Sequence, residues 1–372
     1  MVDIAVVGAG TMGAGIVENA ALAGLSTVMV DVREDALDRG REIIKQDLER
    51  RVKKGRLSED ESREVLGRVT ATTSLETCAD AQLVIEAVVE DMGIKKRVFA
   101  DLGGVVGGDT VLATNTSSLS VAGIAAAADR PERVVGMHFF NPVPAMQLVE
   151  IVAGPSTDTS AVRRAEEISE DLGKTAVRVS DTPGFIVNRV ARPFYLEALR
   201  MVEAGEEPGR IDAAIRNAGF RMGPLELADL IGHDVNLAVS ESLFERYYYH
   251  PRFRPSYLQR SMVEARQLGR KSGRGFYDYG AEEQEDITEP SEGVALRVIS
   301  CIVNEAFLAL SEGVASAEDI DQAMKLGANY PKGPFEWAEE IGAFSIVGNL
   351  DSLRTIHGEA YIAAPALREA GL

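Results

Sequence analysis

The chain begins with a short apolar run that leads into three closely spaced glycines, in the stretch Ile4-Ala5-Val6-Val7-Gly8-Ala9-Gly10-Thr11-Met12-Gly13. The first four residues of this stretch are apolar and predict a buried strand, and the apolar run Ile16–Leu22 predicts a helix after it. The glycine spacing allows a tight turn at Gly8, close approach of a ligand at Gly10, and close packing of helix on strand at Gly13. The sequence therefore predicts a strand, a glycine turn and a helix that together form a nucleotide-binding βαβ unit.

The next strand, Thr27–Val30, ends at Asp31, which completes this unit. Phosphates are expected at the start of the helix, near Thr11 and Met12, where backbone N–H groups have no helical partner. The Asp31 carboxylate would accept hydrogen bonds from ribose hydroxyls and repel a 2′-phosphate, which favours NAD over NADP. Arg33 lies close by and would soften this preference. A glycine turn without a ligand is the alternative reading.

Outward from this unit, short β-branched runs alternate with helical stretches up to about residue 180. Strands separated by helices predict a largely parallel sheet, so the fold class is an α/β, Rossmann-like domain. The predicted strands are Ile4–Val7, Thr27–Val30, Leu83–Glu86, Val111–Thr114, Val134–His138, Leu148–Ile151 and Ala176–Val179.

A long charged segment, Ala36–Val65, predicts a helical hairpin that is broken near Lys54-Gly55. After Asp181-Thr182-Pro183-Gly184 the strand pattern stops, and residues 185–280 are predicted to be helical. The polar stretch Ala281–Pro290 is typical of a linker, and helices are predicted from there to the end.

The last part of the chain repeats the middle part. Ile211-Asp212-Ala213-Ala214 matches Ile320-Asp321-Gln322-Ala323, and Gly223-Pro224-Leu225-Glu226 matches Gly333-Pro334-Phe335-Glu336. An internal duplication of a helical module explains matches of this order and spacing. We therefore expect three domains: residues 1–182 bind the nucleotide, residues 183–280 form a first helical domain, and residues 291–372 form its repeat.

Composition limits the functions that the chain can have. The net charge of −19 disfavours nucleic-acid binding, which needs Lys and Arg against phosphate, and the acidity fits a high-salt habitat as well as an ordinary acidic surface. No uninterrupted apolar run of membrane-spanning length and no leader pattern are present, so neither a membrane span nor a signal peptide is expected. Cys78 and Cys301 form neither a disulfide framework nor a metal-site spacing, which favours the cytoplasm.

Five further strings carry a resemblance to a known family. They run in order along the chain and are jointly specific. They are Asn115-Thr116-Ser117-Ser118-Leu119, His138-Phe139-Phe140-Asn141-Pro142-Val143-Pro144, Leu148-Val149-Glu150, Asp181-Thr182-Pro183-Gly184-Phe185-Ile186-Val187-Asn188-Arg189 and Lys271-Ser272-Gly273-Arg274-Gly275-Phe276-Tyr277. With them, residues 1 to about 280 resemble the L-3-hydroxyacyl-CoA dehydrogenases, including the short-chain 3-hydroxybutyryl-CoA dehydrogenases.

This resemblance implies an NAD-dependent oxidoreductase of fatty acid metabolism and β-oxidation, which reversibly oxidises an L-3-hydroxyacyl-CoA to the 3-ketone. It also implies a Rossmann-like domain followed by an all-helical one, with the active site in the cleft between them. A cleft between domains is a common place for a ligand site.

The resemblance assigns catalytic roles to four residues. His138, at the end of a predicted strand, is the base that accepts the hydroxyl proton, and its ordinary pKa suits that task. Glu150, at the end of the next strand, orients the imidazole and stabilises its charged form. Ser117 binds the 3-oxygen of the substrate, and Asn188 helps to hold the substrate oxygens. Without the resemblance, each of these residues has a structural interpretation. In the same order, they would be a histidine in the core, a solvated strand end, a helix cap and an amide in the core.

The resemblance also assigns binding residues. Glu90 and Lys95 flank the nicotinamide half of the cofactor, with Asn115, Ser117, Asn141 and Lys271 near it. Without the resemblance, Glu90 and Lys95 would be an ordinary charged helix start. Lys54 lies in the basic run Arg50–Arg56 at the hairpin tip and matches a position that contacts the CoA phosphates, although a solvated helix face would have the same sequence.

Two other functions stay open at this point: a related NAD-dependent dehydrogenase of free hydroxy acids, and a non-catalytic, nucleotide-binding structural relative. The basic hairpin tip argues against the first, and the presence of His138 and Glu150 argues against the second. We expect an acyl-CoA substrate, no bound metal, no nucleic-acid or membrane partner, and a homodimer or an internal pseudo-dimer made by the repeat. Acyl chain length, physiological direction and use of NADP are left open.

Overall fold

The computed structural model describes residues 2–280 and 289–371, which form two compact units, Met1–Thr182 and Pro183–Leu372. Each unit has its own helices and its own buried core. Of the predicted linker Ala281–Pro290, residues 281–288 lie outside the described residues.

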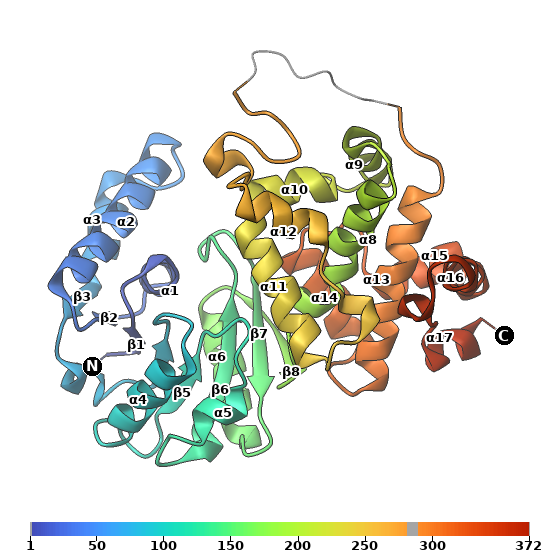
Figure 1. The fold of residues 1–372 in the computed structure, drawn as a ribbon. Helices are drawn as coiled ribbons and strands as arrows, with labels where there is room; N and C mark the ends of the chain where they lie inside the picture. The colour runs from blue at the N-terminus through green and yellow to red at the C-terminus, as the bar shows by residue number, and fades with distance from the viewer. Residues whose placement is uncertain (1, 281–288, 372) are drawn as a thin grey trace. The chain divides into compact units, whose positions relative to one another are not determined.

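The first unit is built on one 8-stranded sheet in the order β3-β2-β1-β4-β5-β6-β7-β8 (Figure 1). All neighbouring strands are parallel except β6 and β7, so the predicted Rossmann-like α/β fold with a mostly parallel sheet is confirmed. The strands are β1 (Ile4–Val7), β2 (Thr27–Val30), β3 (Val69–Thr72), β4 (Leu83–Glu86), β5 (Val111–Thr114), β6 (Val134–Phe139), β7 (Leu148–Ala153) and β8 (Thr175–Ser180).

One strand was not expected from the sequence. The strand β3 pairs with β2 at the edge of the sheet, and its residues are half-buried or exposed. An edge strand buries little on either face and so needs no apolar run. The central strands β1, β2, β4 and β5 are buried along their whole length and match the apolar runs that predicted them.

Helices cover the sheet of the first unit. They are α1 (Thr11–Leu22), α2 (Glu34–Lys53), α3 (Glu59–Gly67), α4 (Met92–Gly103), α5 (Val121–Ala125) and α6 (Thr159–Asp171), with short 3₁₀ turns at Leu75–Cys78 and Pro131–Arg133. The predicted hairpin is α2 and α3, which lie side by side in blue in Figure 1. Gly55 turns the chain with a φ of 64°, and Ser58 with Glu61 forms a capping box that starts α3.

The second unit is helical, and no strand occurs among its described residues, 183–280 and 289–371. Its first part contains α7 (Val187–Val190), α8 (Arg192–Glu203), α9 (Pro208–Asn217), α10 (Pro224–Ile231), α11 (His233–Arg246) and α12 (Tyr257–Glu264), with 3₁₀ turns at Pro251–Phe253 and Arg270–Ser272. Its second part contains α13 (Val294–Ser311), α14 (Ala317–Gly327), α15 (Pro334–Ile341), α16 (Ala343–His357) and α17 (Pro365–Ala370), with a 3₁₀ turn at Glu359–Tyr361.

The two parts of this unit have the same order of helices. The helix series α8, α9, α10, α11 corresponds to α13, α14, α15, α16. In each copy an aspartate caps the third helix of its series: Asp212 accepts from the backbone of Leu225 and Glu226, and Asp321 accepts from that of Phe335 and Glu336.

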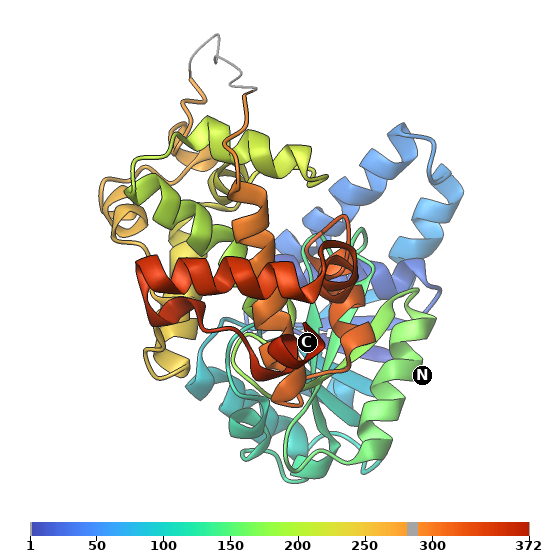
Figure 2. The ribbon, with the colours of Figure 1, turned by 90° about the vertical axis from the view of Figure 1, so that its right-hand side faces the viewer.

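The helix α13 is the only helix in the described part of the chain that is long and apolar enough to cross a membrane. Its sequence holds no uninterrupted apolar run of membrane-spanning length, because Arg297, Asn304 and Glu305 interrupt it. About 67% of that segment is buried inside the protein, where α13 packs on α8, α15 and α16. Figure 2 shows α16, in red, lying across α13, in orange. Its apolar surface is therefore that of a core helix.

Candidate active site

The glycine turn between β1 and α1 has the geometry that its spacing predicts. Gly8 has a φ of 115°, and a Cβ there would lie 2.5 Å from the carbonyl oxygen of Ala87. A Cβ on Gly13 would lie 1.9 Å from the carbonyl oxygen of Gly8, whereas one on Gly10 would meet no atom within 4 Å. Gly8 and Gly13 thus close the turn, and Gly10 leaves its outer face open for a phosphate.

Asp31 holds this turn from the end of β2. Its carboxylate accepts hydrogen bonds from the backbone N–H of Ala9 at 2.9 Å and from that of Arg33 at 3.1 Å. The Arg33 guanidinium pairs with Asp35 at 2.7 Å. The positive charge of Arg33 is therefore balanced by Asp35. Arg33 is then less available to bind the 2′-phosphate of NADP than its place beside Asp31 in the sequence suggested.

We predict that replacing Asp31 by serine narrows the preference for NAD over NADP by at least about 10-fold in kcat/KM, a loss of about 1.4 kcal/mol in discrimination. The reason is that the carboxylate no longer repels a 2′-phosphate. Steady-state kinetics with both cofactors measure this ratio. A natural chain that already prefers NADP would show that Asp31 does not select the cofactor.

His138 and Glu150 form a buried pair. They lie directly opposite each other in the antiparallel ladder of β6 and β7, and His138 Nδ1 is 2.5 Å from Glu150 Oε2. Glu150 is fully buried and His138 is 6% exposed, so the pair is shielded from water. Because an ionised carboxylate can only accept, Nδ1 carries the proton and the basic lone pair is on Nε2. The arrangement can take a proton at Nε2 and stabilise the resulting positive charge.

The structure corrects the expected position of this carboxylate. We expected Glu150 at the end of a strand, but β7 runs from Leu148 to Ala153 and Glu150 is its third residue. The antiparallel hairpin, which the sequence did not reveal, brings it opposite His138.

The loop after β5 is held by Glu90. The Glu90 carboxylate accepts from the Thr116 hydroxyl at 2.6 Å and from the backbone N–H groups of Ser117 and Ser118 at 3.0 and 3.1 Å. Burial raises the pKa of Glu90, but the Thr116 hydrogen bond and the charge of Lys95 outweigh it and hold the pKa below its usual value. Glu90 therefore fixes the position of the partly buried Ser117.

Asn115 precedes this loop, and its side-chain oxygen accepts from the backbone N–H of Phe139 at 2.9 Å. The contact ties the end of β5 to the residue that follows His138. It supports the site through the backbone, and a role of Asn115 toward the cofactor stays a prediction.

Lys95 is buried, which a charged helix start would not be. Its ammonium lies 2.7 Å from Glu86 and 3.3 Å from Glu90. Glu86, at the carboxyl end of β4, also accepts from Val88 N and Thr114 Oγ1. Glu86 was not among the residues predicted from the sequence, although a carboxylate at the end of an apolar strand beside the glycine turn was a signal for it.

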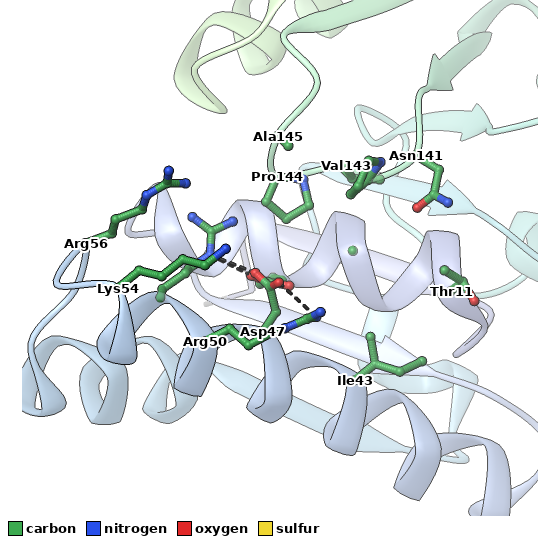
Figure 3. Close-up of a pocket in the computed structure, with 14 residues that line it drawn as sticks. Thr11, Ile43, Asp47, Arg50, Lys54, Arg56, Asn141, Val143, Pro144 and Ala145 are labelled. Atoms are coloured by element: carbon green, nitrogen blue, oxygen red, sulfur yellow. Dashed lines mark hydrogen bonds and ion pairs between the residues drawn. The ribbon is translucent and has the colours of Figure 1, made fainter. Parts of the chain in front are cut away.

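A cavity of about 380 Å³ opens between α1, α2 and the loop Asn141–Ala145 (Figure 3). The hairpin tip contributes four cations to it: Arg50, Arg51, Lys54 and Arg56. Asp47 pairs with Arg50 at 3.1 Å and with Arg51 at 2.7 Å. Neither Lys54 nor Arg56 has an ion-pair partner among the described residues, so their charges are available to a ligand in this cavity.

Lys174 holds the same loop through hydrogen bonds to its backbone. It was not among the residues predicted from the sequence. Its buried ammonium donates to the carbonyl oxygens of Val143 and Met146 at 2.6 and 2.7 Å. Burial lowers the pKa of Lys174 to about 8. A lysine in a helix-to-strand turn gives no local sign of such a contact.

Glu18 lies at the base of this cavity on α1. It is 2% exposed and 3.3 Å from Arg51. Burial, together with the neighbouring Asp47, raises the pKa of Glu18 from 4.5 to about 8. Glu18 is therefore mostly protonated at neutral pH and adds little negative charge to the cavity wall.

This shift predicts a pH dependence of stability. A carboxyl whose pKa is higher in the folded than in the unfolded state contributes stability that is lost as the pH rises through the folded value. Between pH 6 and 9 we expect the melting temperature of the natural chain to fall by about 2–4 °C more than that of Glu18→Gln. Thermal unfolding of both chains across this range measures it, and parallel curves would contradict it.

The two remaining residues lie in the second unit. Asn188 is half-buried in the short helix α7, and Lys271 lies in a 3₁₀ turn, where it pairs with Asp234 at 2.5 Å. Their roles toward substrate and cofactor stay predictions. Arg189, next to Asn188, is fully buried and pairs with Glu305 at 2.7 Å, so its function is to hold the repeat.

Family models match nearly the whole chain. The model described as the 3-hydroxyacyl-CoA dehydrogenase NAD binding domain matches residues 3–182, and that of the C-terminal domain matches residues 184–279 and again 294–370. The chain belongs to the 3-hydroxyacyl-CoA dehydrogenase family. The family resemblance is thus confirmed, together with an oxidoreductase activity and NAD as its cofactor. The open face of Gly10 and the carboxylate of Asp31 fit that cofactor.

Relatives in this family cover the chain to different extents. A 3-hydroxyadipyl-CoA dehydrogenase of Escherichia coli is 38% identical over 96% of this chain and 94% of its own length. A 3-hydroxybutyryl-CoA dehydrogenase of Mycobacterium tuberculosis is 46% identical over 74% of this chain and 98% of its own length. The solved structure of a 3-hydroxybutyryl-CoA dehydrogenase from E. coli K12 is 36% identical, with a TM-score of 0.96 over 100% of this chain and 98% of that one.

Proposed function

We propose that this chain reversibly oxidises the 3-hydroxyl group of an L-3-hydroxyacyl-CoA to the 3-ketone with NAD. The observation that carries the proposal is the buried His138–Glu150 pair. His138 lies on β6. The parallel strands β5 and β4 connect β6 to β1, the strand that leads into the glycine turn. Ligands of open parallel sheets bind outside the carboxyl ends of the strands, where the glycine turn and the end of β6 lie.

The chemistry follows from the tautomer that Glu150 imposes. His138 accepts the hydroxyl proton at Nε2 as the C3–H bond breaks, and it returns the proton in the reverse direction. The Glu150 carboxylate stabilises the imidazolium that forms, because a buried opposite charge favours the protonated ring. When bound, NAD supplies the ring that takes the hydride from C3. Ser117 and Asn188 are proposed to hold the 3-oxygen by hydrogen bonds.

The cavity at the hairpin tip supports a CoA thioester over a free hydroxy acid. On a chain with a net charge of −19, the unpaired cations Lys54 and Arg56 are a local exception. The phosphates of CoA would pair with these two cations, whereas a free hydroxy acid has no phosphate group. The intact His138–Glu150 pair argues against a non-catalytic relative.

We predict that Lys54→Glu raises the KM for acyl-CoA by about 10-fold, since one phosphate contact is lost and one negative charge is added. An acyl-pantetheine that lacks the nucleotide should be affected less than about twofold. Arg63→Glu is the control, because Arg63 is exposed on α3 and does not line the cavity. Equal effects of Lys54→Glu on both substrates would exclude a phosphate contact there.

The second helical copy is proposed to act as an internal partner of the first. Arg189 pairs with Glu305, and Arg297, its counterpart 108 positions later, pairs with Glu197 at 2.8 Å. Reciprocal contacts of this kind characterise a two-fold interface between equal subunits. The position that corresponds to Asn188 is Leu296, so we propose that the second copy has no active site of its own.

Steady-state kinetics with 3-hydroxyacyl-CoAs of increasing chain length, with NAD and NADP side by side, test the proposed function. NAD reduction with the L-enantiomers alone is expected. Activity on free 3-hydroxy acids with none on the thioesters would contradict the proposal. A cytoplasmic location is proposed as well, and the free thiols of Cys78 and Cys301 support it.

A further inference from the structure

Glu86 is a fully buried carboxylate at the carboxyl end of β4, and both of its oxygens accept hydrogen bonds. One oxygen, Oε1, accepts from the backbone N–H of Val88 and from the Lys95 ammonium, each at 2.7 Å. The other, Oε2, accepts from the Thr114 hydroxyl at 2.7 Å. Burying a charged group is costly unless it is paired and hydrogen-bonded, and these three contacts offset that cost.

Lys95 connects this carboxylate to Glu90. The Lys95 side chain is 1% exposed, and its ammonium lies 2.7 Å from Glu86 and 3.3 Å from Glu90 Oε2. The remaining oxygen, Glu90 Oε1, accepts hydrogen bonds from the loop at residues 116–118. Lys95 therefore fixes the rotation of the Glu90 carboxylate, with one oxygen toward the ammonium and the other toward the loop. So deeply buried an ammonium presents almost no surface to a ligand.

Glu86 is also tied to the glycine turn. It accepts from the N–H of Val88, and the backbone of Ala87 and Val88 lies directly against Gly8. A Cβ on Gly8 would be 2.5 Å from the carbonyl oxygen of Ala87 and 2.9 Å from the nitrogen of Val88. A shift of Glu86 would therefore move both the segment behind the glycine turn and, through Lys95, the loop that carries Ser117.

We propose that Glu86 and Lys95 are positioning residues that fix this loop relative to the glycine turn, so that Ser117 is held where it binds the 3-oxygen of the substrate. This inference rests on the proposed function. It gives Lys95 a role through Glu90 in place of a contact with the cofactor. Reaction rates depend steeply on such placement, since a misplacement of about 1 Å can lower a rate by about 100-fold.

Glu86→Gln is expected to lower kcat by at least about 10-fold, while the dissociation constant for NAD stays within about twofold. An amide of the same shape has only one accepting oxygen, so the contact with Thr114 or those with Val88 and Lys95 are lost. Lys95→Met should have the same two effects. Steady-state kinetics with L-3-hydroxybutyryl-CoA and cofactor titration measure them. Either variant would overturn the inference by binding NAD about 10-fold more weakly while keeping its kcat, because that residue would then act on the cofactor.

Thr114→Val tests the same cluster without removing a charge, so the inference stays testable if Glu86→Gln does not fold. Thr110→Val is the matched control, because Thr110 is also buried, at the opposite end of β5, and donates to the carbonyl oxygen of Ala81 at 2.8 Å. Both variants lose one buried hydrogen bond and should melt at a lower temperature than the natural chain. Only Thr114→Val should lower kcat, by about threefold or more. The same kcat in both variants would overturn the inference.

A double-mutant cycle with Ser117→Ala separates positioning from a general loss of packing. If Glu86 acts through Ser117, Glu86→Gln should lower kcat by less than about threefold in a chain that already carries Ser117→Ala, because the positioned hydroxyl is gone. Effects that multiply in the double variant would overturn this inference and leave the proposed function intact. No reduction of NAD by the natural chain would overturn both.

Discussion

A chain with His138 replaced by alanine is expected to turn over 3-hydroxyacyl-CoA at least about 100-fold more slowly than the natural chain, as for the loss of a general base. The Nε2 lone pair that takes the hydroxyl proton is gone, and Glu150 is left as a buried carboxylate without its partner. The affinity for NAD should stay within about twofold, because the glycine turn and Asp31 do not contact the imidazole. Turnover and cofactor titration measure the two effects separately.

His357→Ala is the control, since this histidine is exposed on α16 in the second unit. Glu150→Gln should also lower turnover, because the amide cannot stabilise the imidazolium as a carboxylate does. A His138→Ala chain with a near-normal rate would contradict the mechanism.

A chain that ends at Gly280 is expected to lose stability, to dimerise, or both. Arg189 would stay buried without Glu305 and Glu312, and α8 would expose the apolar surface that α13 covers. Leaving one buried charge unpaired costs about 3–5 kcal/mol, which corresponds to a fall in melting temperature of about 5–9 °C for a chain of this length. Thermal unfolding and light scattering measure these two outcomes.

Glu305→Gln in the full chain should reproduce part of the loss of stability while keeping the second copy in place. Arg260→Gln, which breaks an exposed pair with Glu241, is the matched control. A shortened chain that is monomeric, equally stable and fully active would refute the role of the second copy as an internal partner.

The fold could be predicted from the sequence where the signals are local. The glycine turn and the fully buried central strands are contiguous patterns, and so is the hairpin with its break at Gly55. The edge strand β3 could not be predicted in this way, because its half-exposed residues Val69–Thr72 carry no apolar run. The antiparallel pairing of β6 and β7 depends on tertiary contacts that no local pattern encodes.

The candidate site was predictable to the extent that motifs mark it. His138 and Glu150 were predicted as site residues, but their position opposite each other across β6 and β7 was not. Lys95 looked like part of a charged helix start, and only the folded chain shows it buried against Glu86.

The proposed mechanism requires direct transfer of hydrogen from C3 of the substrate to NAD. The most direct test uses L-3-hydroxybutyryl-CoA carrying deuterium at C3, in a single turnover with NAD, followed by mass spectrometry of the reduced nicotinamide. One deuterium in the reduced cofactor is the predicted result. A reduced cofactor without deuterium, or release of the label into water, would contradict it.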